Sequence, residues 1–384
     1  MDEVINKVAG KRWYSRLDLA SGFWQIPLDR ESSYKCGMIT EWGLYEMKRL
    51  PFGLKNAPSI FQRVMDKILK GIDNVTAYID DILVHTNDFE AHMKTLEIVL
   101  DRMKKNGFKL KGEKCEFLQS KCTYLGLELN KNGYQPAHSN CEVIKQFPEP
   151  RDIKEVKRFL GMTSFFRKFI PNFATLANPL NKLTRGRNPT FIWTEIEAKA
   201  FNELKDKLKE SPCLQPPNFE KPFHLFCDAS NIAYGAALME SKDEINLHAV
   251  SYWSRTLAES ERKLPATHGE LASIYNAVTY FKPIIYGSKL KIYTDHRPIT
   301  YLFSKASTNA KINRWLMALQ DIEPEVVYLE GTANRVADAL SRISISWNSI
   351  KDTMPREDTP YLMVAIGERI NREIIEKKQK KIKF

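Results

Sequence analysis

The chain has 384 residues, 43% of them hydrophobic, and its 58 lysines and arginines exceed its 47 aspartates and glutamates to give a formal net charge of +11. This length predicts two or three packed domains, and the basic excess favours a polyanionic partner such as nucleic acid or an anionic membrane. No apolar run approaches the ~20 residues of a membrane-spanning helix, and the N-terminus lacks a signal peptide's apolar stretch, which disfavours a membrane or secreted protein.

The first ~140 residues predict an α+β domain, because short apolar runs alternate there with amphipathic helical stretches. Residues 77–86 predict a hairpin with two aspartates at its turn. Residues 89–105 predict a helix. Its expected buried face is apolar and carries Met93, Leu96, Val99, Leu100 and Met103.

The middle of the chain has a different character. Prolines interrupt residues 133–222, which predicts short helices forming a spacer or clamp rather than a catalytic core. Strands are predicted again at residues 223–227, 233–239 and 249–253, and then a long helix precedes a strand at residues 290–294.

Three aspartates form a first group of candidate functional residues. Asp18 lies on a predicted strand, and Asp80 and Asp81 lie at the tip of the predicted hairpin. Clustered carboxylates are costly unless cations neutralise them. Two divalent ions ~3.5–4 Å apart between such carboxylates can activate an attacking oxygen and stabilise a leaving one. An Asp-Asp pair is also ordinary turn material, and by itself it favours a structural role.

Four further acids form a second group in the C-terminal half. Asp228 and Asp295 end predicted strands, Glu270 begins the long helix, and Asp338 lies in a short helix. Gaps of 42, 25 and 43 residues separate them, so only the tertiary fold can bring them together. Each acid alone would be a solvated side chain. The two groups together predict two magnesium sites and two chemistries.

Five sequence blocks surround the first group in a fixed order. They are LDLASGFWQI at residues 17–26, LPFGLKNAPSIFQ at 50–62, YIDD at 78–81, KCEF at 114–117 and YLG at 124–126. Together they closely resemble the reverse transcriptase of Ty3/gypsy-type LTR retrotransposons. The resemblance implies that Asp18 and Asp80 bind metal ions and that Asp81, also a candidate ligand and catalytic residue, supports them.

The same resemblance assigns binding roles around these acids. Phe23 matches the gate beneath the sugar that excludes a 2′-hydroxyl, and without the motif it would be interpreted as a core aromatic. Residues 51–58 match the segment under the templating base pair, with Phe52 and Gly53 as nucleotide-binding candidates. The primer grip matches three consecutive residues: Tyr124, Leu125 and Gly126.

The N-terminal part departs from the family pattern. In these enzymes the fingers precede the strand that bears Asp18, and their basic side chains hold the incoming triphosphate. Here seventeen residues precede Asp18, with Lys11, Arg12 and Arg16 among them. We therefore expect that the fingers are missing, that the chain is a fragment of a longer polyprotein or a shortened copy, and that its polymerase activity is impaired.

The second group of acids resembles that of a ribonuclease H domain from the same elements. TDHRPIT at residues 294–300 and ADALSR at 337–342 carry this resemblance. It implies that Asp228, Glu270, Asp295 and Asp338 bind two Mg²⁺ ions that activate water against an RNA phosphate. Contacts with 2′-hydroxyls would select an RNA:DNA hybrid. Mn²⁺ is the alternative ion at both sites.

The predicted fold class is α+β and multidomain. A reverse transcriptase palm, a partial right hand with truncated fingers, is predicted at residues 1–132, and a helical thumb and connection at 133–218. A ribonuclease H-like α/β domain follows at 219–343, and a basic tail or linker at 344–384. Within the thumb, basic residues are predicted to contact duplex phosphates. They are Arg158, Arg167 and Lys168.

The predicted function is that of an RNA-directed DNA polymerase and hybrid ribonuclease of a retrotransposon. Its predicted partners are a template–primer duplex, an RNA:DNA hybrid and deoxynucleoside triphosphates, with no membrane partner. We expect an intracellular protein, in cytoplasmic particles or the nucleus, that is not secreted. The alternative is a decayed or co-opted nucleic-acid-binding protein without enzymatic activity, and all seven acids being present argues against it. A third hypothesis combines an active nuclease with an inactive polymerase.

Overall fold

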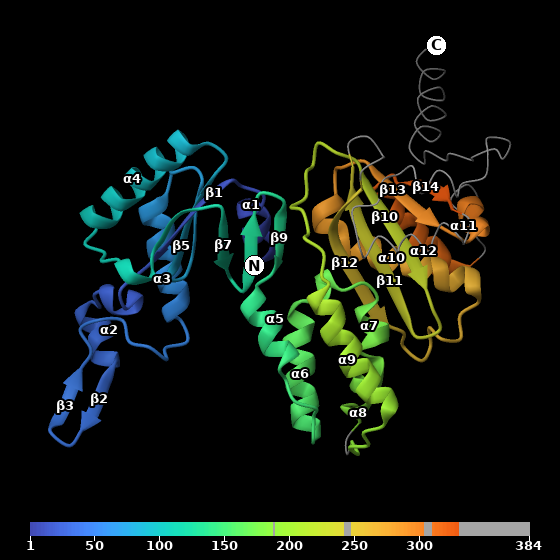
Figure 1. Ribbon diagram of the computed structural model, residues 1–384, viewed down its shortest axis with the longest axis horizontal. Helices are drawn as coiled ribbons and strands as arrows, with labels where there is room; N and C mark the ends of the chain where they lie inside the picture. Colours follow the sequence, from blue (N-terminus) through green and yellow to red (C-terminus); the bar gives the residue numbers. More distant parts are fainter. Residues whose placement is uncertain (187–188, 242–246, 303–308, 330–384) are drawn as a thin grey trace, which may run out of the picture. The chain divides into compact units, whose positions relative to one another are not determined.

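The computed structural model describes residues 1–186, 189–241, 247–302 and 309–329, and the chain divides into two compact units, Met1–Tyr134 and Gln135–Phe384 (Figure 1). Among the described residues, no helix combines the length and apolar character needed to cross a membrane. Asp338 and the predicted tail lie outside the described residues.

The first unit is built on an antiparallel sheet in the order β4-β5-β1-β6. Its strands are β1 (Trp13–Asp18), β4 (Val75–Tyr78), β5 (Asp81–Thr86) and β6 (Glu116–Gln119). Two helices, α3 (Ala57–Leu69) and α4 (Phe89–Lys105), supply the apolar side chains that pack against it. Leu17 and Ile82 from the sheet are completely buried against Phe61 of α3 and Val99 of α4.

Shorter elements complete this unit. The helical ones are α1 (Asp2–Val8), η1 (Gly22–Gln25), α2 (Arg30–Lys35) and η2 (Gly112–Lys114). The strands β2 (Gly37–Thr40) and β3 (Gly43–Glu46) form a hairpin. A separate sheet has the order β7-β8-β9, with bounds Lys121–Tyr124, Leu127–Asn130 and Gly133–Pro136.

The second unit begins with a group of short helices, two of which have polar side-chain N-caps. They are α5 (His138–Lys145), α6 (Ile153–Phe165), η3 (Arg167–Phe169), α7 (Phe173–Leu176), α8 (Asn178–Leu183) and α9 (Glu195–Lys209). Asp152 accepts a hydrogen bond from the third residue of α6, and Thr194 and Glu197 form a capping box at α9. Phe159 packs its ring against Phe147 and Phe201, which joins the helices through an aromatic core.

A five-stranded sheet in the order β12-β11-β10-β13-β14 forms the rest of this unit. Its strands are β10 (Phe223–Ala229), β11 (Ala233–Glu240), β12 (His248–Thr256), β13 (Leu290–Thr294) and β14 (Glu325–Tyr328). Three helices accompany it: α10 (Ala266–Ile285), α11 (Arg297–Leu302) and α12 (Ala310–Gln320). β10 is antiparallel to β11 and parallel to β13, which gives a mixed sheet.

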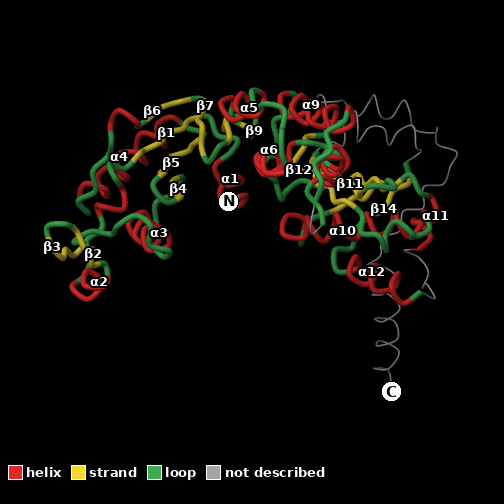
Figure 2. Tube along the Cα trace, turned by 90° about the horizontal axis from the view of Figure 1, so that it is seen from below, coloured by secondary structure: helices red, strands yellow, loops and turns green. Residues whose placement is uncertain are grey.

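Helices cover both faces of this sheet (Figure 2). α10 and α12 lie on one face, and their apolar side chains pack with those of the strands into one core. On the other face, the Ala174 N–H of α7 donates to Ser254 Oγ at 2.8 Å, and the Arg167 guanidinium donates to the Ser254 carbonyl oxygen. Arg167 is thus engaged within the fold. These layers confirm the predicted α+β multidomain fold class.

Candidate active sites

The first group of aspartates is assembled by the palm-like sheet. Asp18 is the last residue of β1 and Asp81 is the first residue of β5, and the two are direct partners in the antiparallel register. Asp80 lies in the turn between β4 and β5, where Tyr78 is opposite Asp81. The hairpin turn therefore brings all three carboxylates to one end of the sheet.

Asp80 has the most unusual environment of the three. Its Oδ1 atom is buried and has no hydrogen-bond donor among the described residues. Burial raises the pKa of Asp80, and the negative charges of Asp81 and Asp18 raise it further. A buried oxygen without a donor, next to two like charges, is a costly arrangement that a bound cation would relieve.

The turn that presents Asp80 is strained, and a helix side chain holds it. Ile79 has a φ of 54°, a left-handed conformation that costs a β-branched residue of order 1–3 kcal/mol. Gln62 of α3 accepts a hydrogen bond from the Ile79 N–H at 2.7 Å and donates one to the Ala77 carbonyl oxygen at 2.9 Å. This role of Gln62 was not predicted from the sequence, because nothing local identifies a partner seventeen residues away.

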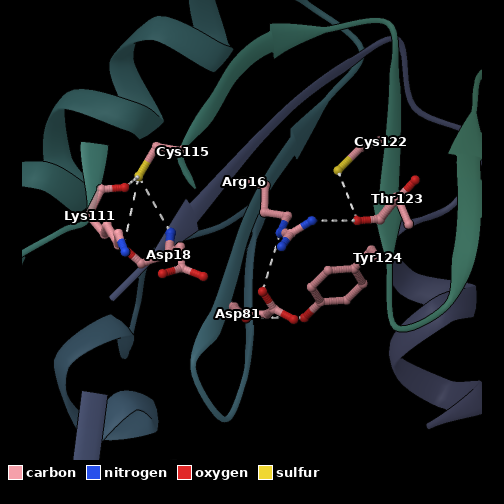
Figure 3. Close-up of polar contacts among 8 residues, drawn as sticks. All are labelled: Arg16, Asp18, Asp81, Lys111, Cys115, Cys122, Thr123 and Tyr124. Atoms are coloured by element: carbon pink, nitrogen blue, oxygen red, sulfur yellow. Dashed lines mark hydrogen bonds and ion pairs between the residues drawn. The ribbon is translucent and has the colours of Figure 1, made fainter. Parts of the chain in front are cut away.

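Asp18 is held through its backbone. Its N–H points to Cys115 Sγ at 3.5 Å, and its carbonyl oxygen accepts a hydrogen bond from the Lys111 N–H at 2.9 Å (Figure 3). Both contacts leave the Asp18 carboxylate available. Asp81 instead makes a side-chain ion pair with Arg16, with 3.3 Å between Arg16 Nε and Asp81 Oδ1.

Close packing around residue 22 explains why the LDLASGF block has a glycine there. A Cβ atom at this position would lie 2.6 Å from Asp80 Oδ1, closer than real contacts allow, and 3.1 Å from the Phe61 ring, which is also tight. The residue is buried next to the catalytic candidate and must be small.

We expect Gly22→Ala to lower the rate of nucleotide addition by ~10–100-fold, because a misplacement of about 1 Å can cost this much. Single-turnover primer extension would measure it, with Gly112→Ala as the control because no atom lies within 4 Å of a Cβ added there. Equal rates for the two variants would show that the Asp80 position does not depend on Gly22.

The predicted nucleotide-binding residues lie together. The Phe23 ring packs edge-on against Phe52 and Phe61, with centroid distances of 5.4 and 5.2 Å. Phe23 is half-buried against the core, whereas Phe52 is 58% exposed. Gly53 has a φ of 89°, which favours glycine. Phe23 thus contacts the core and is still partly accessible, which suits both of its interpretations.

The predicted primer-grip residues end β7. Tyr124 is buried, and its hydroxyl donates to the Asp81 carbonyl oxygen at 3.4 Å. Leu125 and Gly126 form the turn to β8 with φ values of 51° and 81°. Of these three predicted residues, Leu125 and Gly126 are partly exposed to solvent and Tyr124 is not, so a contact with a primer would be made by Leu125 and Gly126.

The second group of acids lies at the carboxyl ends of two parallel strands. Phe226 and Tyr293 are the last residues of β10 and β13 that pair with each other, and Asp228 and Asp295 each lie two residues beyond them. Carboxyl ends of parallel strands meet at one edge of a sheet. Glu270 is on α10, which is tied to this edge by a hydrogen bond from Ser273 Oγ to the Asp228 carbonyl oxygen at 3.0 Å.

Glu270 is the centre of this second cluster. Burial, and then the charges of Asp295 and Asp228, raise the pKa of Glu270 to about 8. His296 also connects the end of β13 to α10, because its Nε2 atom lies 2.7 Å from Oγ1 of Thr267 on α10. This link was not predicted, although His296 lies beside Asp295 in the sequence.

We expect the stability of the metal-free protein to fall as pH rises from about 4.5 to about 8. In this window the unfolded chain releases the Glu270 proton while the folded chain retains it, so the limiting slope is ~1.4 kcal/mol per pH unit. Urea unfolding in EDTA at several pH values would measure it. Glu270→Gln should remove this component, and an unchanged pH dependence in that variant would contradict the assignment.

The donor sets of both sites suit a hard cation, because they consist of carboxylate oxygens, and burial raises the pKa of one carboxyl in each set, Asp80 and Glu270. Among the described residues, no three His, Cys, Asp or Glu side chains are already arranged to hold a metal ion. Asp338 is outside the described residues.

Two family models match the chain in succession. The reverse transcriptase (RNA-dependent DNA polymerase) model matches residues 2–129, and the model of the RNase H-like domain found in reverse transcriptase matches residues 218–322. Both families generally depend on divalent metal ions. The first match contains Asp18, Asp80 and Asp81, and the second contains Asp228, Glu270 and Asp295.

Solved structures of similar fold are foamy viral protease–reverse transcriptases. The complex with dsDNA has a TM-score of 0.76 at 23% identity and covers 85% of this chain and 70% of that chain. The complex with an RNA/DNA hybrid has a TM-score of 0.71 at 22% identity, covering 86% and 45%. At these identities the similarity is one of fold.

Curated relatives are transposon polyproteins. The Pol polyprotein from Drosophila melanogaster transposon 297 is 37% identical over 350 residues, which cover 91% of this chain and 33% of the relative. That from transposon gypsy is 32% identical over 89% and 34% of the two chains, and the Tf2-7 polyprotein of Schizosaccharomyces pombe (strain 972) is 30% identical over 89% and 26%. The chain thus spans about a third or less of these relatives. It belongs, over that span, to the reverse transcriptase and ribonuclease H portion of the gypsy-type LTR-retrotransposon Pol polyproteins.

Proposed function

We propose that this chain is an RNA-directed DNA polymerase and an RNA:DNA hybrid ribonuclease, with one site in each unit. The observation that carries the proposal is the pair of carboxylate clusters at strand ends, each with one member whose pKa is raised by burial and then by the neighbouring carboxylates. Perturbed acids of this kind concentrate at functional sites. The matched domains contain Asp18, Asp80 and Asp81 of the first cluster, and Asp228, Glu270 and Asp295 of the second.

At the polymerase site, Asp18 and Asp80 are the proposed metal ligands and Asp81 supports them. Two Mg²⁺ ions, or Mn²⁺ in their place, would neutralise charge and polarise the reacting phosphate when bound. The chain itself supplies positioning, which phosphoryl transfer mainly requires. Gln62 fixes the turn that carries Asp80. The Phe23 ring is the proposed sugar gate.

The substrates of this site are proposed to be a template–primer duplex and deoxynucleoside triphosphates. Phe52 and Gly53 would lie near the nucleotide, and the turn at Leu125 and Gly126 would contact the primer. A formal charge of +11 supports a polyanionic partner. The foamy viral complexes with dsDNA and with RNA/DNA hybrid are consistent with such partners.

At the nuclease site, Asp228, Glu270, Asp295 and Asp338 are the proposed ligands of two further Mg²⁺ or Mn²⁺ ions. The raised pKa of Glu270 means that this carboxyl holds a proton near neutral pH until a cation displaces it. Glu270 lies on α10, and the hydrogen bond from Ser273 Oγ to the Asp228 carbonyl oxygen holds this helix against the end of β10. The substrate is proposed to be the RNA strand of a hybrid.

The test is one labelled DNA primer on an RNA template, incubated with deoxynucleoside triphosphates and either Mg²⁺ or EDTA. We expect RNA cleavage and primer extension in Mg²⁺ and neither in EDTA, with extension the slower of the two reactions because the sequence predicts an impaired polymerase. Salt-sensitive binding of the hybrid without either reaction would favour a non-enzymatic nucleic-acid-binding protein. Cleavage without extension would leave only the nuclease half of the proposal.

A further inference from the structure

Arg16 lies two residues before Asp18 on β1 and reaches two different elements. Its Nε atom pairs with Asp81 Oδ1 at 3.3 Å, and its Nη1 atom donates to the Thr123 carbonyl oxygen at 3.2 Å. Figure 3 shows the guanidinium between these two acceptors. Its side chain is 26% exposed, so part of the ion pair is shielded from solvent.

The second acceptor of Arg16 belongs to a different sheet from the first. Asp81 begins β5 of the sheet β4-β5-β1-β6, whereas Thr123 lies on β7 of the sheet β7-β8-β9. No backbone pairing between strands joins these two sheets in the described part of the unit. The chain passes from β6 to β7 through Ser120, and side-chain bonds such as those of Arg16 add a second connection, which links β7 directly to Asp81.

Tyr124, the residue after Thr123 on β7, makes a second connection to Asp81. Its hydroxyl donates to the Asp81 carbonyl oxygen at 3.4 Å, and its ring is buried with only 1% exposure. Asp81 is thus tied to β7 twice, by its carboxylate through Arg16 and by its backbone through Tyr124. The turn that follows Tyr124 is the proposed primer contact, Leu125 and Gly126.

The guanidinium suits this task for a geometric reason. Its donors lie in one rigid plane, so bonds from two of its nitrogens fix the distance between the acceptors. A lysine ammonium on a flexible chain could replace either bond and not both with the same geometry. The positive charge also offsets Asp81, which leaves Asp18 and Asp80 as the carboxylates open to a cation.

We propose that Arg16 is a positioning residue for nucleotide addition, which holds the primer-contacting turn in register with the catalytic aspartates. This inference rests on the proposed polymerase function. Arg16 would act through Asp81 and Thr123 without touching the substrate. Its loss should therefore affect the rate of the chemical step more than the affinity for the primer.

The test compares Arg16→Ala, Arg16→Lys and Tyr124→Phe with Arg12→Ala, which removes the same charge from an exposed side chain four residues earlier. Single-turnover addition of the first nucleotide gives the rate, and fluorescence anisotropy of a labelled template–primer gives its Kd. We expect Arg16→Ala to lower the rate by ~10–100-fold with the Kd changed by less than about threefold. Arg16→Lys should recover part of the rate, and Tyr124→Phe should lose less than Arg16→Ala.

Several outcomes would overturn the inference. Equal rates in Arg16→Ala and the unsubstituted chain would do so, and so would equal losses in Arg16→Ala and Arg12→Ala. A raised Kd at an unchanged rate would make Arg16 a phosphate contact instead. If Arg16→Ala does not fold by circular dichroism, Arg16→Lys and Tyr124→Phe decide, and unsubstituted rates in both would overturn it. Failure of the unsubstituted chain to extend any primer would overturn the proposed polymerase function itself.

Discussion

Replacing Asp80 by asparagine should lower nucleotide addition by at least ~100-fold, the effect of losing about 3 kcal/mol of charge stabilisation. Asparagine keeps the size of the side chain and removes the charge that a cation requires. The bonds of Gln62 go to backbone atoms of Ile79 and Ala77, so the turn should persist. Single-turnover extension of a labelled primer would measure the loss, and hybrid cleavage should be unaffected.

Stability gives an independent readout for this variant. The Asp80 pKa is raised by burial and by two neighbouring carboxylates, so removing its charge should stabilise the metal-free protein at neutral pH. Loss of activity together with a gain in stability is characteristic of a functional site. The matched control is Asp73→Asn, an exposed acid before the same hairpin. A variant that extends primers like this control would rule Asp80 out as a ligand.

Replacing Glu270 by glutamine should lower cleavage of the RNA strand of a hybrid by at least ~100-fold and leave primer extension intact. Glutamine is nearly isosteric, so the packing of α10 should be preserved. The lost charge is the one whose pKa is raised to about 8 by burial, Asp295 and Asp228. A hybrid with a labelled RNA strand would report the cleavage rate.

Glu259→Gln is the control for this second variant, because it removes an exposed glutamate from the same unit. We expect it to cleave at the rate of the unsubstituted chain. Persistent cleavage in Glu270→Gln would mean that the acids at the strand ends do not form the nuclease site. Loss of extension in Glu270→Gln would argue against two independent sites.

Helices and strands with a regular hydrophobic pattern could be predicted from the sequence with accurate bounds. The helix at residues 89–105 and the strand at 290–294 have the predicted bounds in the structure. Within that helix, however, the predicted buried residue Met93 is 44% exposed, while His92 is completely buried. His92 is buried because its two ring nitrogens lie 2.8 Å from Ser15 Oγ and 3.0 Å from Thr86 Oγ1, contacts that hydropathy does not encode.

The candidate site could be predicted in part, because motif blocks identify the acids but not what holds them. The YIDD block predicts Asp80 and Asp81 as site residues, whereas the supporting bonds of Gln62 and Arg16 come from elements brought close by the fold. The separation of Arg16 and Thr123 is 107 residues. Tertiary contacts of this kind leave no periodic signal in the sequence.

We propose that one chain carries two separate carboxylate sites with two activities. The most direct measurement follows DNA extension and RNA cleavage on one doubly labelled hybrid, with Asp80→Asn and Glu270→Gln tested side by side in Mg²⁺. The predicted result is reciprocal: Asp80→Asn loses extension and keeps cleavage, and Glu270→Gln keeps extension and loses cleavage. Loss of both activities in either variant, or of neither activity in both, would contradict the claim.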